Sequence, residues 1–291
     1  PGGAPCNVLA MLNKQGYKTA FIGKVGNDIF GRQLKAAAQE AGINTDGLVT
    51  DESVNTTLAF VHTLPGGDRE FSFYRNPGAD MMLSESDIDY KLIQNSSIFH
   101  FGSLSMTGEI CEAATKKAVE TAKESGAIIS FDPNLRENLW DSLDKAREKI
   151  AYGISECDIL KISDNEIQWF TGEQDFDRAV EILRGRYGNI KLLLLSLGKN
   201  GSRAYCGENS AFAPAAPANT IETTGAGDTF CGGILAKVLK YGLRNYSAEE
   251  LTGILNYANS AAGIVTERRG ALKVMPSPAE INERMERITN D

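Results

Sequence analysis

The stretch TTGAGDTFCGG, residues 223–233, places three glycines around one acid, Asp228, where an apolar helical pattern begins. A glycine-rich turn that leads into a helix presents free backbone N–H groups and therefore binds phosphate. A carboxylate in such a turn needs another explanation, because it repels phosphate. Asp228 could cap the helix, or it could act as a base that takes a proton from an attacking hydroxyl while the N–H groups stabilise the transferred phosphoryl group. In the second reading the helix dipole would keep the carboxylate ionised.

Two common glycine motifs do not describe this turn. A P-loop requires GxxxxGK[ST], which occurs nowhere in the chain. A dinucleotide fingerprint requires GxGxxG, but GAGDTF has Phe230 at the third glycine position, and the turn comes late in the chain. A nicotinamide-dependent oxidoreductase is therefore disfavoured.

Outward from this turn, strand-like and helix-like segments alternate. The strand candidates are 18–25, 97–102, 127–132, 158–162 and 191–197, and the helix candidates are 2–16, 28–42, 107–125, 141–154, 175–187 and 247–270. Nearly continuous apolar strands that alternate with helices predict an α/β domain whose parallel sheet is covered on both faces. One segment differs: residues 56–75 read as an antiparallel hairpin with a PGGD turn, which we interpret as a lid or an interface. No linker divides residues 1–291, so we expect one domain.

Composition limits the function. The chain has 291 residues, 42% of them hydrophobic, and a net charge of −8, which favours one large folded domain and disfavours nucleic acid as a partner. The five cysteines are scattered without zinc-ligand spacing, as expected for reduced thiols of a cytoplasmic protein. His62 and His100 lie in strand-like runs and read as ordinary core or surface residues. The longest apolar run, 192–195, is far too short to span a membrane.

Five motifs together resemble those of the ribokinase-like (pfkB) carbohydrate kinases, in the same order over essentially the whole chain. They are PGGAPCNV at 1–8, DPNLR at 132–136, SDNE at 163–166, LGKNG at 197–201 and TTGAGDTF at 223–230. The resemblance implies a three-layer α/β/α domain with a mainly parallel central sheet and a small β lid. The stretches GKVGND, NTTLAFV and FSFYRNPGAD look most like bacterial fructokinases, which implies ATP-dependent phosphorylation of D-fructose to fructose 6-phosphate.

Two alternatives stay open at this point. One is another pfkB-type kinase that acts on ribose, a nucleoside or 2-keto-3-deoxygluconate, since a few hydrogen bonds decide the acceptor. The other is a non-catalytic sugar- or nucleotide-binding sensor, against which Asp228 and Arg136 argue, because binding alone needs neither a base nor a cation at the transition state.

The resemblance assigns roles by position. Asp228 would be the catalytic base, Gly225, Ala226 and Gly227 the anion hole, and Arg136 the cation at the moving phosphoryl group. The sugar-binding set would be Gly2, Gly3, Asn7, Phe73, Arg75 and Asn134. The nucleotide-binding set would be Ser196, Gly198, Gly201 and Asn259, the last close to the adenine.

The resemblance also implies metal ions. Glu166 would organise Mg²⁺ through water, although Ser163 replaces the asparagine of the family's NxxE motif. Glu222, in place of the usual aspartate, and Thr224 are candidates for a K⁺ site.

Family members begin with a strand that carries a sugar-binding acid, followed by further lid strand. This chain starts after both, so we expect the N-terminal strand and the first lid strands to be missing. The apolar residues Leu58, Phe60, Phe71 and Phe73 of the hairpin need cover on one face. We therefore expect the hairpin to close over the sugar or to pair with a second subunit in a homodimer.

Overall fold

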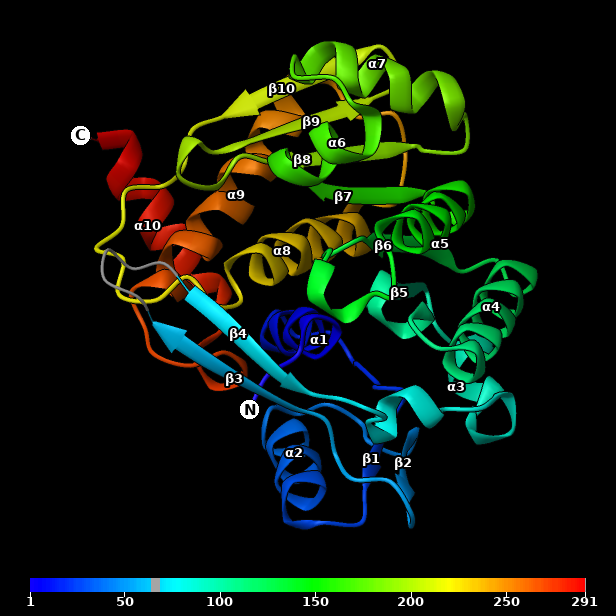
Figure 1. Ribbon diagram of the computed structural model, residues 1–291. Helices are drawn as coiled ribbons and strands as arrows, with labels where there is room; N and C mark the ends of the chain where they lie inside the picture. The colour runs from blue at the N-terminus through cyan, green and yellow to red at the C-terminus, as the bar shows by residue number, and fades with distance from the viewer. Residues whose placement is uncertain (64–68, 291) are drawn as a thin grey trace.

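The computed structural model describes residues 1–63 and 69–290 as an α/β structure (Figure 1). Its strands are β1 (Gly23–Gly26), β2 (Leu48–Asp51), β3 (Leu58–Thr63), β4 (Arg69–Tyr74), β5 (Ile98–Gly102), β6 (Ile128–Asp132), β7 (Ile159–Ser163), β8 (Leu192–Ser196), β9 (Ser202–Cys206) and β10 (Asn209–Ala213). Its α-helices are α1 (Ala4–Lys14), α2 (Ile29–Glu40), α3 (Tyr90–Gln94), α4 (Glu109–Glu124), α5 (Leu143–Glu156), α6 (Asp164–Thr171), α7 (Phe176–Arg186), α8 (Ala226–Tyr241), α9 (Ala248–Thr266) and α10 (Pro278–Asn290). Short 3-10 turns are η1 (Ala79–Met82), η2 (Glu85–Asp87), η3 (Ser103–Met106), η4 (Glu137–Leu139), η5 (Gly198–Asn200) and η6 (Leu272–Val274).

The central sheet has the strand order β10-β9-β8-β7-β6-β5. Strands β5 to β8 are parallel to one another, whereas β9 and β10 pair antiparallel at one edge. The mainly parallel sheet that the sequence predicted is confirmed. The β9–β10 hairpin was not predicted, because SRAYC and NSAFA are short and contain few large apolar residues.

Strand β8 shows why the sheet is covered on both faces. Side chains alternate along a strand, so Leu193 and Leu195 pack in the core on the side of α4, α5, α6 and α7. Leu192 and Leu194 point the other way, into the core formed with α8 and α9. The run LLLL therefore fills two hydrophobic layers at once, and the three-layer arrangement follows.

Helix α8 is packed tightly against its neighbours at two glycines. A Cβ on Gly233 would lie 3.2 Å from the Cα of Ala258 in α9, and one on Gly232 would lie 2.7 Å from the Cβ of Met11 in α1. The small residues predicted for 247–270 thus serve close helix packing in α9, although the helix itself ends at Thr266. Among the helices of the described part, none has the length and hydrophobicity needed to cross a membrane.

The hairpin predicted at 56–75 is confirmed as β3 and β4, which stand apart from the six-stranded sheet (Figure 1). Its PGGD turn lies outside the described residues. The prediction that Leu58, Phe60, Phe71 and Phe73 share a face is wrong. The register pairs Leu58 with Tyr74 and Ala59 with Phe73, so Phe73 belongs to the face opposite Leu58 and Phe60.

Strands β1 and β2 form a separate parallel pair. Lys24 of β1 connects this pair to the following segment, because its ammonium lies 3.4 Å from Asp51 of β2 and 2.9 Å from Asp87 of η2. The Asp51 carboxylate also accepts hydrogen bonds from the N–H and hydroxyl groups of Ser53. The hydrogen bonds from Ser53, with those from Val54 and Lys24, lower the pKa of Asp51 to about 2.

Candidate active site

The carboxyl ends of the parallel strands collect most of the candidate residues at one edge of the sheet. Asp132, Ser163 and Ser196 are the last residues of β6, β7 and β8. In open α/β sheets ligands bind outside these strand ends. The sites implied at 132–136, 163–166 and 196–201 therefore lie along a single edge.

The glycine turn begins α8. Gly225 is the N-cap in the left-handed conformation (φ 78°, ψ 0°), which glycine adopts without strain. Ala226 and Gly227 form the first turn, where backbone N–H groups lack helical partners; the N–H of Ala226 makes a long hydrogen bond of 3.2 Å to the Thr223 carbonyl. This geometry fits the predicted anion hole.

Asp228 does not cap α8. It is the third residue of the helix, Gly225 occupies the N-cap position, and no side chain caps the end. The capping interpretation is wrong. Its Oδ2 accepts a hydrogen bond of 2.7 Å from Nδ2 of Asn7 in α1.

The pKa of Asp228 is raised. Burial raises it, and the Asn7 hydrogen bond and the charges of Lys161 and Arg136 only partly oppose that effect. The ionising influence that we expected from the helix dipole is thus outweighed by burial. A carboxylate with a raised pKa is a stronger base, which suits proton abstraction from a hydroxyl.

A buried ion pair that the sequence analysis missed lies next to this carboxylate. Lys161 Nζ lies 2.9 Å from Asp132 Oδ2, and the two side chains are only 8% and 5% exposed. A Cβ on Gly227 would lie 3.5 Å from Lys161 Nζ, so the ammonium reaches the first turn of α8. The signal in the sequence was a lysine inside the apolar strand ILKIS, where a charge needs a buried partner.

The charges of this pair depend on their surroundings. Burial lowers the pKa of Lys161, but the charges of Asp132, Glu166 and Asp228 outweigh it and the pKa is raised. Burial raises the pKa of Asp132 to about 6 against the opposing charge of Lys161. At pH 7 the Lys161 ammonium therefore lies beside the Asp132 carboxylate.

The loop after β6 carries Asn134 and Arg136. Asn134 has a left-handed backbone (φ 44°), unusual for a residue other than glycine, and its N–H donates to Asp132 Oδ1 at 3.2 Å. Arg136 donates from Nη1 to the Leu135 carbonyl, and its charge acts on Asp228. The Arg136 charge therefore acts in the neighbourhood of Asp228, while its predicted role at the moving phosphoryl group stays a prediction.

Glu166 has a structural role that the sequence did not suggest. Its Oε2 accepts from the N–H and hydroxyl of Ser163 at 2.9 and 2.7 Å, which forms a capping box at the start of α6. Its Oε1 accepts from the N–H of Leu135 at 2.7 Å. Ser163 therefore caps α6, and Glu166 joins α6 to the loop of Asn134.

Gly2 and Gly3 precede α1, and Asn7 in the first turn of that helix reaches the start of α8, since a Cβ on Gly225 would lie 3.6 Å from Asn7 Nδ2. Gly3 is the N-cap of α1 with φ 149°, and both glycines are exposed. Asn7 is only 3% exposed. Its amide donates to the Asp228 carboxylate.

The residues predicted to bind the nucleotide, apart from Asn259, lie in and around η5. Gly198 and Gly201 have φ values of 54° and 103°, and a Cβ on Gly201 would lie 2.2 Å from the Ala213 carbonyl oxygen. Asn259 donates from Nδ2 to the carbonyls of Ala213 and Pro214 at 3.1 and 2.9 Å and accepts from Ser202 at 2.9 Å. Both ends of its amide bond to protein atoms. Asn259 therefore supports the backbone at 213–214 and is not directed at the adenine of a nucleotide.

The two candidates for a K⁺ site, Glu222 and Thr224, lie in the segment that precedes α8. Glu222 Oε2 accepts from the N–H of Gly270 at 3.2 Å, and its N–H donates to the Thr266 carbonyl. Thr224 is half-buried. Within residues 1–63 and 69–290, no group of three or more His, Cys, Asp or Glu side chains is arranged to hold a metal ion.

The base of the hairpin is held by Arg75 and Asp80. The Arg75 side chain is 6% exposed and donates to Asp80 at 2.8 Å, to Thr107 at 2.7 Å and to the Leu104 carbonyl at 2.9 Å. The second oxygen of Asp80 accepts from the Thr57 hydroxyl, so one carboxylate holds both ends of the hairpin. Arg75 is an anchor of the hairpin here, and Phe73 is partly buried.

The remaining cysteine and histidine predictions are confirmed where the structure describes them. All five cysteines are buried free thiols. His100 bonds through Nδ1 to the Ser130 hydroxyl at 3.0 Å, and burial lowers the pKa of His100 to about 4. The His62 side chain lies outside the described ones.

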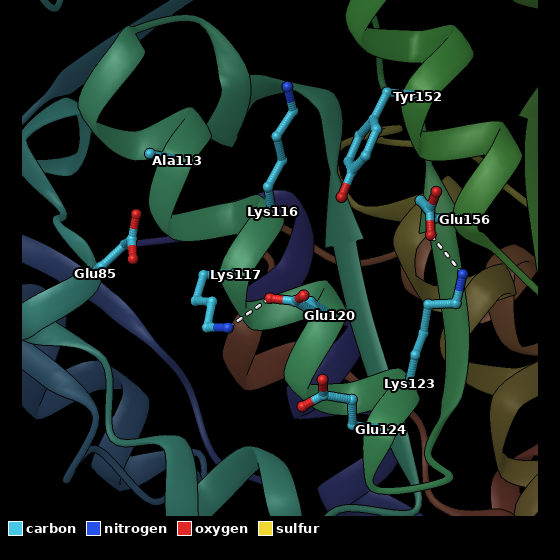
Figure 2. A pocket seen from close by; sticks show the side chains of 9 residues that line it. All are labelled: Glu85, Ala113, Lys116, Lys117, Glu120, Lys123, Glu124, Tyr152 and Glu156. Carbon is cyan, nitrogen blue, oxygen red and sulfur yellow. Dashed lines mark hydrogen bonds and ion pairs between the residues drawn. The ribbon is translucent and has the colours of Figure 1, made fainter.

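A hollow of about 590 Å³ lies between η2, α4 and α5 (Figure 2). Its lysines are neutralised locally: Lys117 pairs with Glu120 and Lys123 with Glu156, each at 2.5 Å. None of the predicted site residues lines it. This hollow is therefore separate from the site at the strand ends.

Comparison with known proteins agrees with this arrangement. A family model described as pfkB family carbohydrate kinase matches residues 1–278. Fructokinase-1 of Zea mays is 38% identical over 287 residues, which cover 99% of this chain and 88% of that protein. A fructokinase structure from Xylella fastidiosa with bound ATP has a TM-score of 0.90 at 29% identity and covers 99% of this chain and 91% of its own. The fructokinase from Vibrio cholerae O395 in its fructose-, ADP- and calcium-bound form has a TM-score of 0.89 at 27% identity, with 98% and 91% covered.

The motifs, the three-layer fold and the match over 278 residues agree. The likeness to fructokinase structures confirms the ribokinase-like fold. The chain belongs to the pfkB family of carbohydrate kinases.

Proposed function

We propose that this enzyme transfers the γ-phosphoryl group of ATP to the 6-hydroxyl of D-fructose and forms fructose 6-phosphate. The observation that carries the proposal is the half-buried Asp228 carboxylate, which does not cap α8 although it lies in its first turn, and on which the charges of Lys161 and Arg136 act. The fructokinase names of the relatives support the choice of acceptor.

The proposed step is an in-line displacement. The acceptor hydroxyl gives its proton to Asp228, its oxygen bonds to the γ-phosphorus, and the bond from that phosphorus to the bridging oxygen breaks to release ADP. Backbone N–H groups of Gly225, Ala226 and Gly227 stabilise the phosphoryl oxygens. Arg136 neutralises charge as it moves between donor and acceptor. Asp228 then passes its proton to solvent.

We assign the nucleotide to the segment that follows β8, and the ions to residues near it. ATP lies along Ser196, Gly198 and Gly201, with Asn259 holding the neighbouring backbone. Glu166 would hold Mg²⁺ through water, since both Glu166 oxygens already accept protein hydrogen bonds, and the ion would supply positive charge for the phosphates of the nucleotide. Glu222 and Thr224 are the residues that we assign to K⁺.

The sugar pocket is assigned to the turn of Gly2 and Gly3, to Asn134, and to Phe73 and Arg75 of the hairpin, which acts as a lid. Phe60 and Tyr74 on this hairpin are 57% and 68% exposed and contact each other edge to face at 5.5 Å. An exposed aromatic pair favours an apolar partner, and we propose a homodimer through this face. Sedimentation tests it: a monomer at micromolar concentration contradicts the dimer. The reduced thiols favour the cytoplasm.

The deciding experiment compares the parent with Asp228→Asn on a panel of acceptors. Asparagine keeps the shape but cannot take the proton, so kcat should fall by roughly 10²–10⁴ while ATP binding is retained. D-Fructose should exceed ribose and nucleosides in kcat/KM by at least about tenfold. A preference for ribose, a nucleoside or 2-keto-3-deoxygluconate would indicate another pfkB kinase, and binding without turnover would indicate a sensor.

A further inference from the structure

A second hollow, of about 400 Å³, lies between the end of α8, the loop that follows it and the first turns of α9. Helix α8 supplies Lys237 and Tyr241 to its lining, and α9 supplies Gly253 and Ile254. None of the residues assigned above to sugar, nucleotide or ions lines it. Lys237 lies roughly 14 Å from Asp228 along α8, at 1.5 Å per residue. This hollow is therefore separate from the candidate active site.

The loop and α9 add an ion pair to the lining. Arg244 donates from Nη1 and Nη2 to the two carboxylate oxygens of Glu250, at 3.1 and 2.5 Å. The guanidinium also lies 4.8 Å from the centre of the Tyr246 ring. Because Arg244 and Glu250 neutralise each other, the pair gives the hollow no net charge.

Lys237 has no such partner. Within residues 1–63 and 69–290 its ammonium makes no ion pair and no hydrogen bond, and it lies over the Tyr257 ring at 3.3 Å from the ring centre. Burial lowers the pKa of Lys237, and the charge of Lys240 lowers it further. The face of the tyrosine ring attracts the ammonium but is not a counter-charge. The lining therefore carries one positive charge that no carboxylate balances.

The hollow of Figure 2 differs in this respect. There Lys116 lies 2.6 Å from Glu112, and Lys117 and Lys123 are paired with glutamates as described above. Each lysine of that lining already has a carboxylate partner, so an anionic ligand would have to displace one. At Lys237 an anion displaces nothing.

The rest of the second hollow is suited to a flat apolar group. The Tyr241 side chain is 47% exposed, and a Cβ on Gly253 would meet no atom within 4 Å, so the wall formed by α9 is open at this position. Ile254 lies next to Gly253 on the same lining. A hollow of this volume falls within the range of roughly 300–1,000 Å³ that small-molecule sites occupy.

We propose that this hollow binds a small aromatic monocarboxylate, whose carboxylate pairs with the Lys237 ammonium and whose ring packs against Tyr241 and Gly253. One negative charge matches the one unbalanced ammonium, whereas the second charge of a phosphate ester would lie near Glu250. The proposal does not depend on the kinase function, and it adds a binding site remote from the catalytic one.

The experiment titrates the protein with 2-naphthoate and follows the ligand by NMR. The parent should bind it with a Kd of about 1 mM or lower, as expected for a ligand of this size. Lys237→Met removes the charge, and Gly253→Leu fills the hollow from α9, so each should weaken binding about tenfold or more. Lys240→Met is the matched control, since it removes the same charge from the same helix but Lys240 does not line the hollow. Its Kd should stay within about twofold of the parent's.

Two related probes test the class of ligand. The neutral 2-naphthylmethanol has the same ring system without the charge, so it should bind about tenfold more weakly than 2-naphthoate and equally to the parent and to Lys237→Met. The dianion 2-naphthyl phosphate should bind less tightly than 2-naphthoate. Tighter binding of the phosphate overturns the assignment to a monocarboxylate.

The site itself is refuted if the parent does not bind 2-naphthoate, if Lys237→Met binds it as the parent does, or if saturating ATP displaces it. Thermal melting shows whether each variant is folded; where one is not, the other decides by the same criterion. If neither Lys237→Met nor Gly253→Leu folds, these residues are structural and the inference fails. All of these are binding measurements, so a parent without kinase activity refutes the proposed function and leaves this inference to its own result.

Discussion

Replacement of Lys161 by methionine should destabilise the fold strongly. The change keeps the length of the side chain but removes the ammonium that lies 2.9 Å from Asp132, in a pair whose side chains are 8% and 5% exposed. Asp132 is then a buried carboxylate without its cation. Breaking a buried pair by removing one partner costs about 3–5 kcal/mol, a large part of the roughly 5–15 kcal/mol that stabilises a typical domain.

The pH dependence has a definite sign. Burial raises the pKa of Asp132 to about 6 even with Lys161 present. In Lys161→Met the positive charge that opposes this rise is absent, so the pKa of Asp132 should rise further. A carboxyl group whose pKa is raised in the folded state favours that state at low pH and loses this contribution as the pH rises. The deficit of Lys161→Met should therefore shrink as the pH falls from 8 toward 5.

Urea denaturation followed by circular dichroism at several pH values measures these free energies. The double variant Lys161→Met/Asp132→Leu removes both charges and should recover most of the loss. A loss below about 1 kcal/mol for Lys161→Met, or a deficit that grows at low pH, would refute the reasoning.

Three further outcomes follow from single contacts. Gly153→Ala should lower the free energy of unfolding, measured by urea denaturation, by about 1–3 kcal/mol, because the new Cβ would lie 2.3 Å from the Phe131 ring. Gly253→Ala, where a Cβ would meet open space, should be neutral or stabilising by up to about 1 kcal/mol. Equal effects of the two substitutions would contradict this packing. Asp80→Ala should release both ends of the hairpin and raise the KM for the sugar more than that for ATP in steady-state assays; unchanged constants would argue against the clamp. Asp51→Asn should weaken the fall in melting temperature between pH 4 and 2, since a carboxyl with its pKa lowered to about 2 stabilises above its ordinary pKa and loses that contribution as the pH falls; parallel melting curves would contradict it.

Much of the fold could be predicted because it depends on local patterns. The apolar strands before Asp132, Ser163 and Ser196 are continuous, which requires cover on both faces and so predicts a parallel sheet between helices. The glycines at 225 and 227 predict an anion-binding helix start without any tertiary information. The short β9–β10 edge was missed because its residues carry little periodic signal.

The faces of the hairpin show a different limit. Which residues of β4 share a side with Phe60 depends on the pairing register, and a shift of one residue moves Phe73 to the other side. The sequence of 56–75 predicts two strands but not their register. Only the paired structure shows that Tyr74, and not Phe73, lies on the exposed aromatic face.

The sequence by itself determined the parallel strands β5 to β8, most of the helices that cover them, and the presence of a glycine turn at the start of α8. The tertiary structure alone decided what surrounds that carboxylate: Asn7 from a helix 221 residues away, and the Lys161–Asp132 pair from adjacent strands. Contacts between distant residues depend on strand order and on how closely helices approach at glycines such as Gly232. A local pattern carries the period of a helix or strand, but it does not carry the distance between two of them.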